Sequence, residues 1–319
     1  MTKAVWHWNS NLNPWCPKQE PQWTKYSDIE NEIIEKAYQN HQNYVELDLY
    51  WIDLEHKVQK KKSNYNKQRP IKRILIENEN NLREERFFIP PKLSKTFSSY
   101  SIHHSDFINE WIKRNFHIIH DIKKIVQNAI DGIIHEGHLL EQDNEAKWLG
   151  NKLIQFENST QEEINECCVH LYTRESFLYK LLNKTLREDD MSKVDTLGSF
   201  AYLLYESSSN LKKHLYQGVV YRGAKLESDM IDDYKKALND GCRSWSGFTS
   251  TSRNRRKAEK FGNILFIIDI LRSNTAIDVS SLSEYPSEQE VLIGAGWNFS
   301  INNIEFDHNG KQIIYIKQD

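Results

Sequence analysis

The stretch Glu288-Gln289-Glu290-Val291-Leu292-Ile293 decides how this chain is interpreted. The apolar run after the second glutamate predicts a short buried β-strand. If the strand already includes Glu288, the side chains of Glu288 and Glu290 point to one face, because residues two apart in a strand share a face. Two carboxylates at one site suit the cleavage of a glycosidic bond to ribose, where one stabilises an oxocarbenium-like charge and the other moves a proton.

Two further motifs precede this stretch and make chemical sense with it. Tyr221-Arg222-Gly223 ends an apolar, strand-like run. Its arginine offers a planar, permanently charged fork for phosphate oxygens, and its glycine lets backbone approach a ligand closely. Gly247-Phe248-Thr249-Ser250-Thr251-Ser252 supplies small hydroxyl groups that hydrogen-bond polar neighbours without filling a pocket. Each motif alone has an ordinary structural explanation, so the prediction depends on the ordered set.

In this order and spacing the three motifs resemble the Arg–Ser–Glu class of ADP-ribosyltransferases, which includes arginine-modifying vertebrate enzymes and related bacterial toxins. The resemblance covers about residues 150–319, including the segments 168–173 and 182–187 with Tyr179 before the second. It implies NAD as co-substrate and no metal. It also implies that Arg222 holds the NAD phosphates, Gly223 receives the nicotinamide amide, Ser250 orients the cofactor, Glu290 stabilises the oxocarbenium ion and Glu288 addresses the incoming nucleophile.

The residue at position 288 bears on the acceptor. A guanidinium is protonated at neutral pH and needs a carboxylate to hold it and take its proton as it attacks. In the family that the chain resembles, glutamate at this position goes with arginine acceptors, so Glu288 favours protein arginine as the substrate group. Two alternatives stay open: an NAD glycohydrolase, in which water outcompetes the acceptor, and a catalytically silent adaptor.

The pattern of apolar and polar residues along the chain predicts an α+β protein with four parts. Apolar residues recur at helical spacing from about residue 101 to 215, and β-type runs follow from Val219 onward. Pro90-Pro91 marks a boundary, because two prolines fit neither a helix interior nor a central strand. We therefore expect an N-terminal domain at 1–80, a linker at 81–100, a helical segment at 101–150 and the catalytic domain at 151–319, for which the resemblance implies a core of two packed sheets.

The N-terminal part combines aromatic and basic residues. From Lys57 to Arg73 there are eight basic residues and no acidic one. Trp6, Trp23 and Glu35 fit the pattern of a WWE domain, and some members of that family bind the iso-ADP-ribose unit of poly(ADP-ribose). The resemblance implies that Trp8 and Tyr50 flank the adenine and that Gln59 and Arg69 reach the polar groups and phosphates. Other WWE domains bind proteins, and segment 11–22 looks like an inserted loop.

Composition sets the remaining expectations. The chain has 319 residues, a net charge of −3 and four cysteines without a disulfide or metal-knuckle spacing. No run is long enough to cross a bilayer, and the N-terminus lacks the layout of a signal peptide. We expect an intracellular protein without membrane or direct nucleic-acid partners. The pairs His117/His120 and His135/His138 fit helix faces better than a metal site, since no cysteine accompanies them and the zinc-protease pattern His-Glu-x-x-His is absent.

Overall fold

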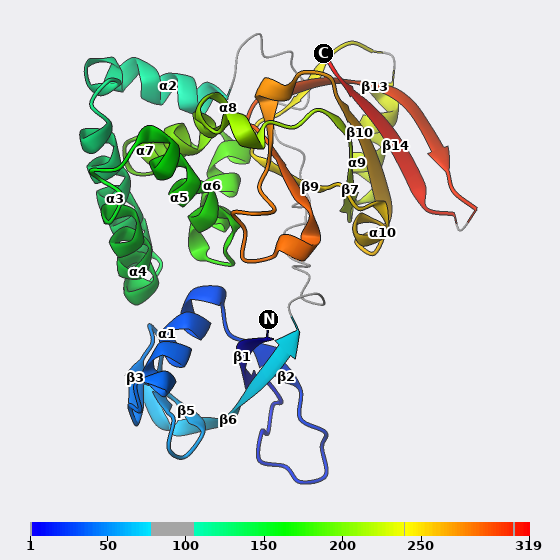
Figure 1. Cartoon of the computed structure of the whole chain (residues 1–319). Helices are drawn as coiled ribbons and strands as arrows, with labels where there is room; N and C mark the ends of the chain where they lie inside the picture. Colours follow the sequence, from blue (N-terminus) through cyan, green and yellow to red (C-terminus); the bar gives the residue numbers. More distant parts are fainter. Residues whose placement is uncertain (1, 78–104, 239, 309) are drawn as a thin grey trace.

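A computed structural model of the protein describes residues 2–77, 105–238, 240–308 and 310–319. The predicted linker, 81–100, lies outside the described residues. Figure 1 shows a small domain made by the first 77 residues (blue to cyan) and a larger domain made by the rest of the described chain. The small domain packs against the side of the larger one on which residues 279–289 (orange) lie.

The N-terminal domain is an antiparallel sheet of order β2-β1-β6-β5-β4-β3 packed against one helix. Ser27 and Glu30 form a capping box that starts this helix, and its Ile29, Ile34 and Ala37 are buried at helical spacing. Trp6 Nε1 donates to Glu35 Oε2 at 2.8 Å. The elements are β1 (Thr2–Asn9), β2 (Trp23–Lys25), α1 (Asp28–Gln39), β3 (Tyr44–Glu46), β4 (Tyr50–Asp53), β5 (Val58–Lys61) and β6 (Asn64–Glu77).

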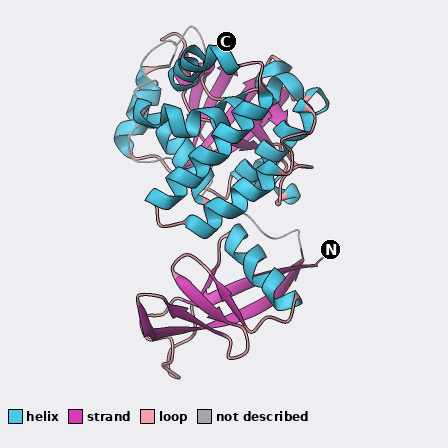
Figure 2. Cartoon of the chain, turned by 90° about the vertical axis from the view of Figure 1, so that its left-hand side faces the viewer, coloured by secondary structure: helices cyan, strands magenta, loops and turns pink. Residues whose placement is uncertain are grey.

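A layer of helices follows and shares one apolar core, in which Trp111, Tyr172 and Phe200 are fully buried. Figure 2 shows this layer in front of the strands of the larger domain. The predicted helical segment is therefore present from residue 106 onward. Its elements are α2 (Asp106–Asn115), η4 (Phe116–Ile118), α3 (Ile122–Leu139), α4 (Asp143–Ile154), α5 (Gln161–Thr173), α6 (Phe177–Glu188), η5 (Met191–Lys193), α7 (Val194–Tyr205), α8 (Ser207–Asn210) and η6 (Lys212–His214).

The C-terminal part is an eight-stranded sheet of order β11-β12-β9-β7-β10-β14-β13-β8. All its pairs are antiparallel except β10 with β14. The elements are β7 (Gly218–Ala224), α9 (Ser228–Lys236), β8 (Arg243–Trp245), β9 (Thr249–Ser252), α10 (Arg255–Ala258), β10 (Ile264–Ile270), η7 (Ser273–Thr275), β11 (Ala276–Asp278), η8 (Pro286–Glu288), β12 (Glu290–Ile293), β13 (Trp297–Phe306) and β14 (Gln312–Gln318).

The two halves of this sheet meet at a single residue pair. Tyr221 of β7 pairs with Ser252 of β9, whereas every other strand junction in the sheet has three or more pairs. Val291 and Ile293 from one half share an apolar cluster with Phe266 and Ile268 from the other, so the halves pack on each other. The α+β class is confirmed. The two packed sheets that we expected are the two halves of one continuous hydrogen-bonded sheet. Arg222, the neighbour of Tyr221 on β7, lies at this junction.

Candidate active site

Strands β9 and β12 bring the serine motif and Glu290 together. Their antiparallel register pairs Ser252 with Glu290 and Ser250 with Leu292. Residues that pair directly, or lie two positions apart, share a face of the sheet. Ser250, Ser252 and Glu290 therefore lie on one face, and all three are buried, with Glu290 only 2% exposed.

Arg222 completes this group from the neighbouring strand β7. Its Nη1 donates to the backbone oxygen of Ser250 at 2.5 Å. Burial lowers the pKa of the Arg222 guanidinium to about 10, the charge of Arg187 acts in the same direction, and the charge of Glu290 opposes both. The structure thus places Arg222, Ser250 and Glu290 in one buried cluster, as the sequence motifs predicted.

Glu288 reaches the cluster in a different way from the one predicted. The strand begins at Glu290, while Glu288 ends the 3-10 turn η8 and Gln289 adopts a left-handed φ of 50°. The expectation that Glu288 and Glu290 share a face by strand alternation is therefore wrong. Its physical cause is Pro286, whose fixed φ starts a turn at this point. Ser252 Oγ donates to the Glu288 carbonyl at 2.6 Å, so the serine motif still fixes the turn beside Glu290.

Gly223 lies where a side chain has no room. A Cβ atom at this position would stand 2.0 Å from the carbonyl oxygen of Ala258 and 2.6 Å from that of Phe261. The glycine thus allows α10 and the turn after it to lie directly on β7. This contact is structural, and the predicted role of the Gly223 backbone toward nicotinamide stays a prediction.

Arg187 is a site residue for which the sequence analysis gave no role. Burial lowers the pKa of its guanidinium, and its charge reaches Arg222. Its Nε is buried without a hydrogen-bond partner among the described residues. Two partly desolvated cations repel each other, so an anion between them would relieve both. Two arginines placed in this way suit the charge of a pyrophosphate.

Helices α5 and α6 close the cluster on the side of Arg187. Asn183 Nδ2 donates to the Tyr172 hydroxyl at 2.7 Å, and the Tyr172 ring meets the Phe248 ring edge-on at 5.7 Å between centroids. A Cβ at Gly247 would lie 3.2 Å from Asn183 Oδ1, so this glycine lets the serine motif approach α6. The signal that could have revealed the role of α6 is the polar series Tyr179, Asn183, Arg187, whose spacing of four places all three on one face of the helix.

Comparison with known proteins decides the family. The sequence model of NAD:arginine ADP-ribosyltransferases matches residues 142–319, which is more than half of the chain. The chain belongs to this family. The model of the WWE domain matches residues 4–73, so a WWE domain precedes the ADP-ribosyltransferase domain in this protein.

Individual relatives are more distant. The chain is 32% identical over 147 residues to Mav of Mycobacterium avium (strain 104), which carries the name of an NAD(+)–arginine ADP-ribosyltransferase; the match covers 43% of this chain and 16% of that protein. Among solved structures, the ADP-ribosyltransferase HopU1 of Pseudomonas syringae pv. Tomato DC3000 has 19% identity, a TM-score of 0.45 and coverage of 54% and 87%. The type III effector XopAI of Xanthomonas axonopodis pv. citri has 16% identity, a TM-score of 0.49 and coverage of 70% and 96%.

In the WWE domain, three of the four predicted ligand residues lie together. Gln59 and Arg69 pair across β5 and β6, and the Arg69 guanidinium lies 5.5 Å from the centre of the Trp8 ring. Tyr50 is half-buried on β4 and packs, like Trp8, against the core cluster of this domain. Gln59 is buried, accepts from the Tyr26 hydroxyl at 2.7 Å and leaves its Nε2 without a partner among the described residues.

Hydrogen bonds at the start of the inserted loop use one nitrogen of the Arg69 guanidinium. Nη1 of Arg69 donates to the carbonyl oxygens of Asn9 at 2.8 Å and Asn11 at 2.6 Å. Trp15 Nε1 of the same loop donates to the Gln68 carbonyl at 3.2 Å. The loop is therefore held along β6, beside the predicted ligand residues, and Arg69 orders it.

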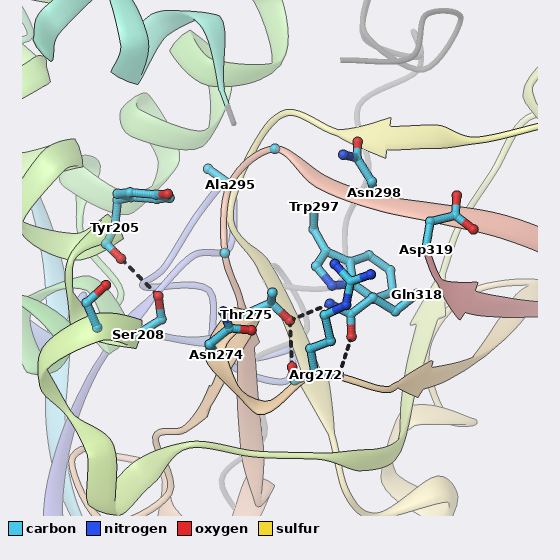
Figure 3. A pocket seen from close by; sticks show the side chains of 13 residues that line it. Tyr205, Ser208, Arg272, Asn274, Thr275, Ala295, Trp297, Asn298, Gln318 and Asp319 are labelled. Atoms are coloured by element: carbon cyan, nitrogen blue, oxygen red, sulfur yellow. Dashed lines mark hydrogen bonds between the residues drawn. The ribbon is translucent and has the colours of Figure 1, made fainter. Parts of the chain in front are cut away.

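A hollow of about 340 Å³ lies away from both predicted sites. Figure 3 shows Arg272, Trp297 and Gln318 on one side of it, with Tyr205 and Ser208 on the other. Its glycine-rich edge, 294–296, follows the end of β12 opposite to Glu290. None of the residues predicted for NAD lines this hollow.

Among residues 2–77, 105–238, 240–308 and 310–319, no cluster of three or more histidine, cysteine, aspartate or glutamate side chains is arranged to bind a metal ion. Within the same residues, no helix combines the length and apolar character needed to cross a membrane.

Proposed function

We propose that the protein is a mono-ADP-ribosyltransferase that transfers ADP-ribose from NAD to arginine side chains of proteins and releases nicotinamide. The observation that carries the proposal is the buried cluster of Arg222, Ser250 and Glu290, in which a guanidinium and a carboxylate from different strands act on each other. The family membership of residues 142–319 supports the same reaction.

The residues divide the reaction between them. Arg222 and Arg187 would hold the pyrophosphate of NAD by charge-assisted hydrogen bonds. The bond between ribose and nicotinamide breaks, nicotinamide leaves with the electron pair, and the Glu290 carboxylate stabilises the positive charge left on the ribose. A guanidinium nitrogen of the acceptor then bonds to the ribose carbon and gives its proton to Glu288.

A labelling assay tests this proposal. Full-length protein is incubated with NAD and agmatine, a small guanidine acceptor, and the products are separated by mass spectrometry. We expect ADP-ribosyl-agmatine from the wild type and a loss of at least about 100-fold in Glu290→Gln, because the charge that stabilises the transition state is removed. Glu227→Gln, at an exposed position, is the matched control. Free ADP-ribose without adduct would indicate a glycohydrolase, and no turnover by any variant would indicate an adaptor.

We further propose that the WWE domain binds iso-ADP-ribose and brings the enzyme to ADP-ribosylated proteins. The unpaired Nε2 of Gln59 and the stack of Arg69 on Trp8 support a ligand that joins a flat base to phosphates. Calorimetry with iso-ADP-ribose tests it: heat from the wild type and from Lys67→Ala, an exposed control on the same strand, but not from Arg69→Ala, is expected. No heat from the wild type would reject this ligand and leave protein binding. The intracellular location stays a prediction.

A further inference from the structure

The WWE domain contacts the segment that carries Glu288. We name residues 284–289 the Glu288 turn. Lys3 Nζ of β1 donates to Glu284 Oε2 at 3.0 Å and stands 5.5 Å from the centre of the Tyr285 ring. The Tyr285 hydroxyl donates to Asp28 Oδ1 at the start of α1. Side chains from two elements of the WWE domain therefore hold the first two residues of the turn.

The contact is anchored from the ADP-ribosyltransferase domain as well. Arg174, which is 5% exposed, pairs with Glu284 of the turn and, at 2.9 Å, with Glu32 of α1. Its guanidinium also lies 4.7 Å from the centre of the Trp148 ring. Burial alone would raise the pKa of the Glu284 carboxyl, but the charges of Arg174 and Lys3 bring it below its ordinary value. Glu284 is thus a carboxylate held by one cation from each domain.

The backbone passes this restraint on to Glu288. The amide of Glu288 donates to the Tyr285 carbonyl at 2.9 Å, and the amide of Gln289 donates to the Pro286 carbonyl at 3.1 Å. Gln289 lies in the left-handed region, which is strained for a residue other than glycine. A turn that stores this strain keeps its shape only while its surroundings hold it.

We propose that the WWE domain completes the acceptor side of the active site, with Asp28 and Lys3 as positioning residues that act on Glu288 through Tyr285 and Glu284. This inference rests on the proposed function, because Glu288 is there the group that takes the proton of the acceptor guanidinium. NAD is held by Arg222 and Arg187 on other elements, so loss of the restraint impairs transfer more than NAD hydrolysis. Misplacing a catalytic group by about 1 Å can cost about 100-fold in rate.

The test uses the full chain and three variants that change few atoms. Tyr285→Phe removes the hydroxyl that donates to Asp28 and keeps the ring beside Lys3. Asp28→Asn replaces the carboxylate that accepts this hydrogen bond by a neutral amide. The matched control is Asp48→Asn. Asp48 also joins the two domains, because it accepts from the amide of Asn144 at 2.6 Å, but Asn144 is far from the Glu288 turn along the chain. Agmatine transfer and NAD hydrolysis are measured for each, together with hydrogen–deuterium exchange over residues 284–290 and the unfolding midpoint.

We expect the ratio of transfer to hydrolysis to fall about 10-fold in Tyr285→Phe and Asp28→Asn, the range of one hydrogen bond to a charged group, and to stay at the wild-type value in Asp48→Asn. Amide exchange at Glu288 rises in the first two variants only. An unchanged ratio with unchanged exchange, or an equal fall in the control, overturns the inference. If the wild type does not turn over NAD at all, the proposed function fails, and the exchange data alone decide whether the WWE domain positions the turn.

Discussion

We expect Glu145, a buried carboxyl at the junction between the two domains, to make stability depend on pH. It lies in the first turn of α4, is 6% exposed, and accepts from the amide of Phe177 at 2.6 Å. From the WWE domain, the Ser27 hydroxyl donates to its second oxygen at 3.4 Å. Burial raises the pKa of this carboxyl to about 7; the Phe177 amide opposes the shift, and the nearby acidic groups of Glu30 and Asp48 add to it.

The size and sign of the effect follow from proton linkage. One pKa unit is worth about 1.4 kcal/mol, so raising the pKa of Glu145 from its ordinary 4.5 to about 7 corresponds to about 3 kcal/mol. Between these two pH values the unfolded chain has lost the proton and the folded protein keeps it. The free energy of unfolding therefore falls as pH rises from about 4.5 to about 7 and stays lower above that.

Substitution of Glu145 by glutamine isolates this contribution. The amide keeps an oxygen for the Phe177 amide and carries no charge at any pH. Urea denaturation followed between pH 4.5 and 8 should show equal stability for wild type and Glu145→Gln at the acid end, and an advantage of up to about 3 kcal/mol for the variant at pH 8. Glu141→Gln, an exposed neighbour, is the control and should follow the wild type. Parallel wild-type and Glu145→Gln curves across this range would refute the reasoning.

Three further predictions concern the site and its support. Glu288→Gln should lower agmatine transfer by about 100-fold or more and NAD hydrolysis much less, because only transfer needs a proton acceptor for guanidinium; equal losses in product analysis would contradict the assigned role. Arg187→Met should raise the KM for NAD by about 10–100-fold, the value of a charge-assisted bond, and an unchanged KM in steady-state kinetics would remove Arg187 from the phosphate site. Because the pKa of Glu284 is lowered, its contribution to stability is present above pH 4.5 and lost as pH falls further, so Glu284→Gln should flatten thermal unfolding midpoints between pH 5 and 3.

Local patterns predicted most of the elements. The apolar run Ile264–Ile270 is β10 with the same bounds, and the run near Gln312 is β14. Helical spacing predicts helices over about 161–172 and 196–205, and the bounds of α5 and α7 lie within two residues of these. These signals are local, because the spacing of apolar residues within one segment indicates which face of a helix or strand is buried. The three motifs also predicted that Arg222, Ser250 and Glu290 lie together. That prediction came from the resemblance of the ordered set to the Arg–Ser–Glu class and needed no knowledge of how the strands pair.

What the sequence analysis missed depends on contacts between distant residues. The spacing of Tyr179, Asn183 and Arg187 marks a polar face of α6, but it does not indicate that the Arg187 guanidinium lies within electrostatic reach of Arg222 on β7. The turn before β12 departs from the strand alternation that two glutamates before an apolar run suggest, because Pro286 starts a 3-10 turn there. The salt bridges of Arg174 join residues more than one hundred positions apart and follow no period.

The arrangement of charges explains why the two domains belong to one working unit. Lys3 and Arg174 lie on different domains and share the carboxylate of Glu284, while Asp28 and Glu32 from α1 reach Tyr285 and Arg174. A linker alone would require none of these contacts, and surface ion pairs on independent domains contribute little. Here the ion pairs and hydrogen bonds between the domains gather at the few residues before Glu288, so docking stabilises the turn that the proposal assigns to the acceptor. A WWE domain that served only to tether the enzyme would show the same family match but no effect of Asp28→Asn on the choice between transfer and hydrolysis.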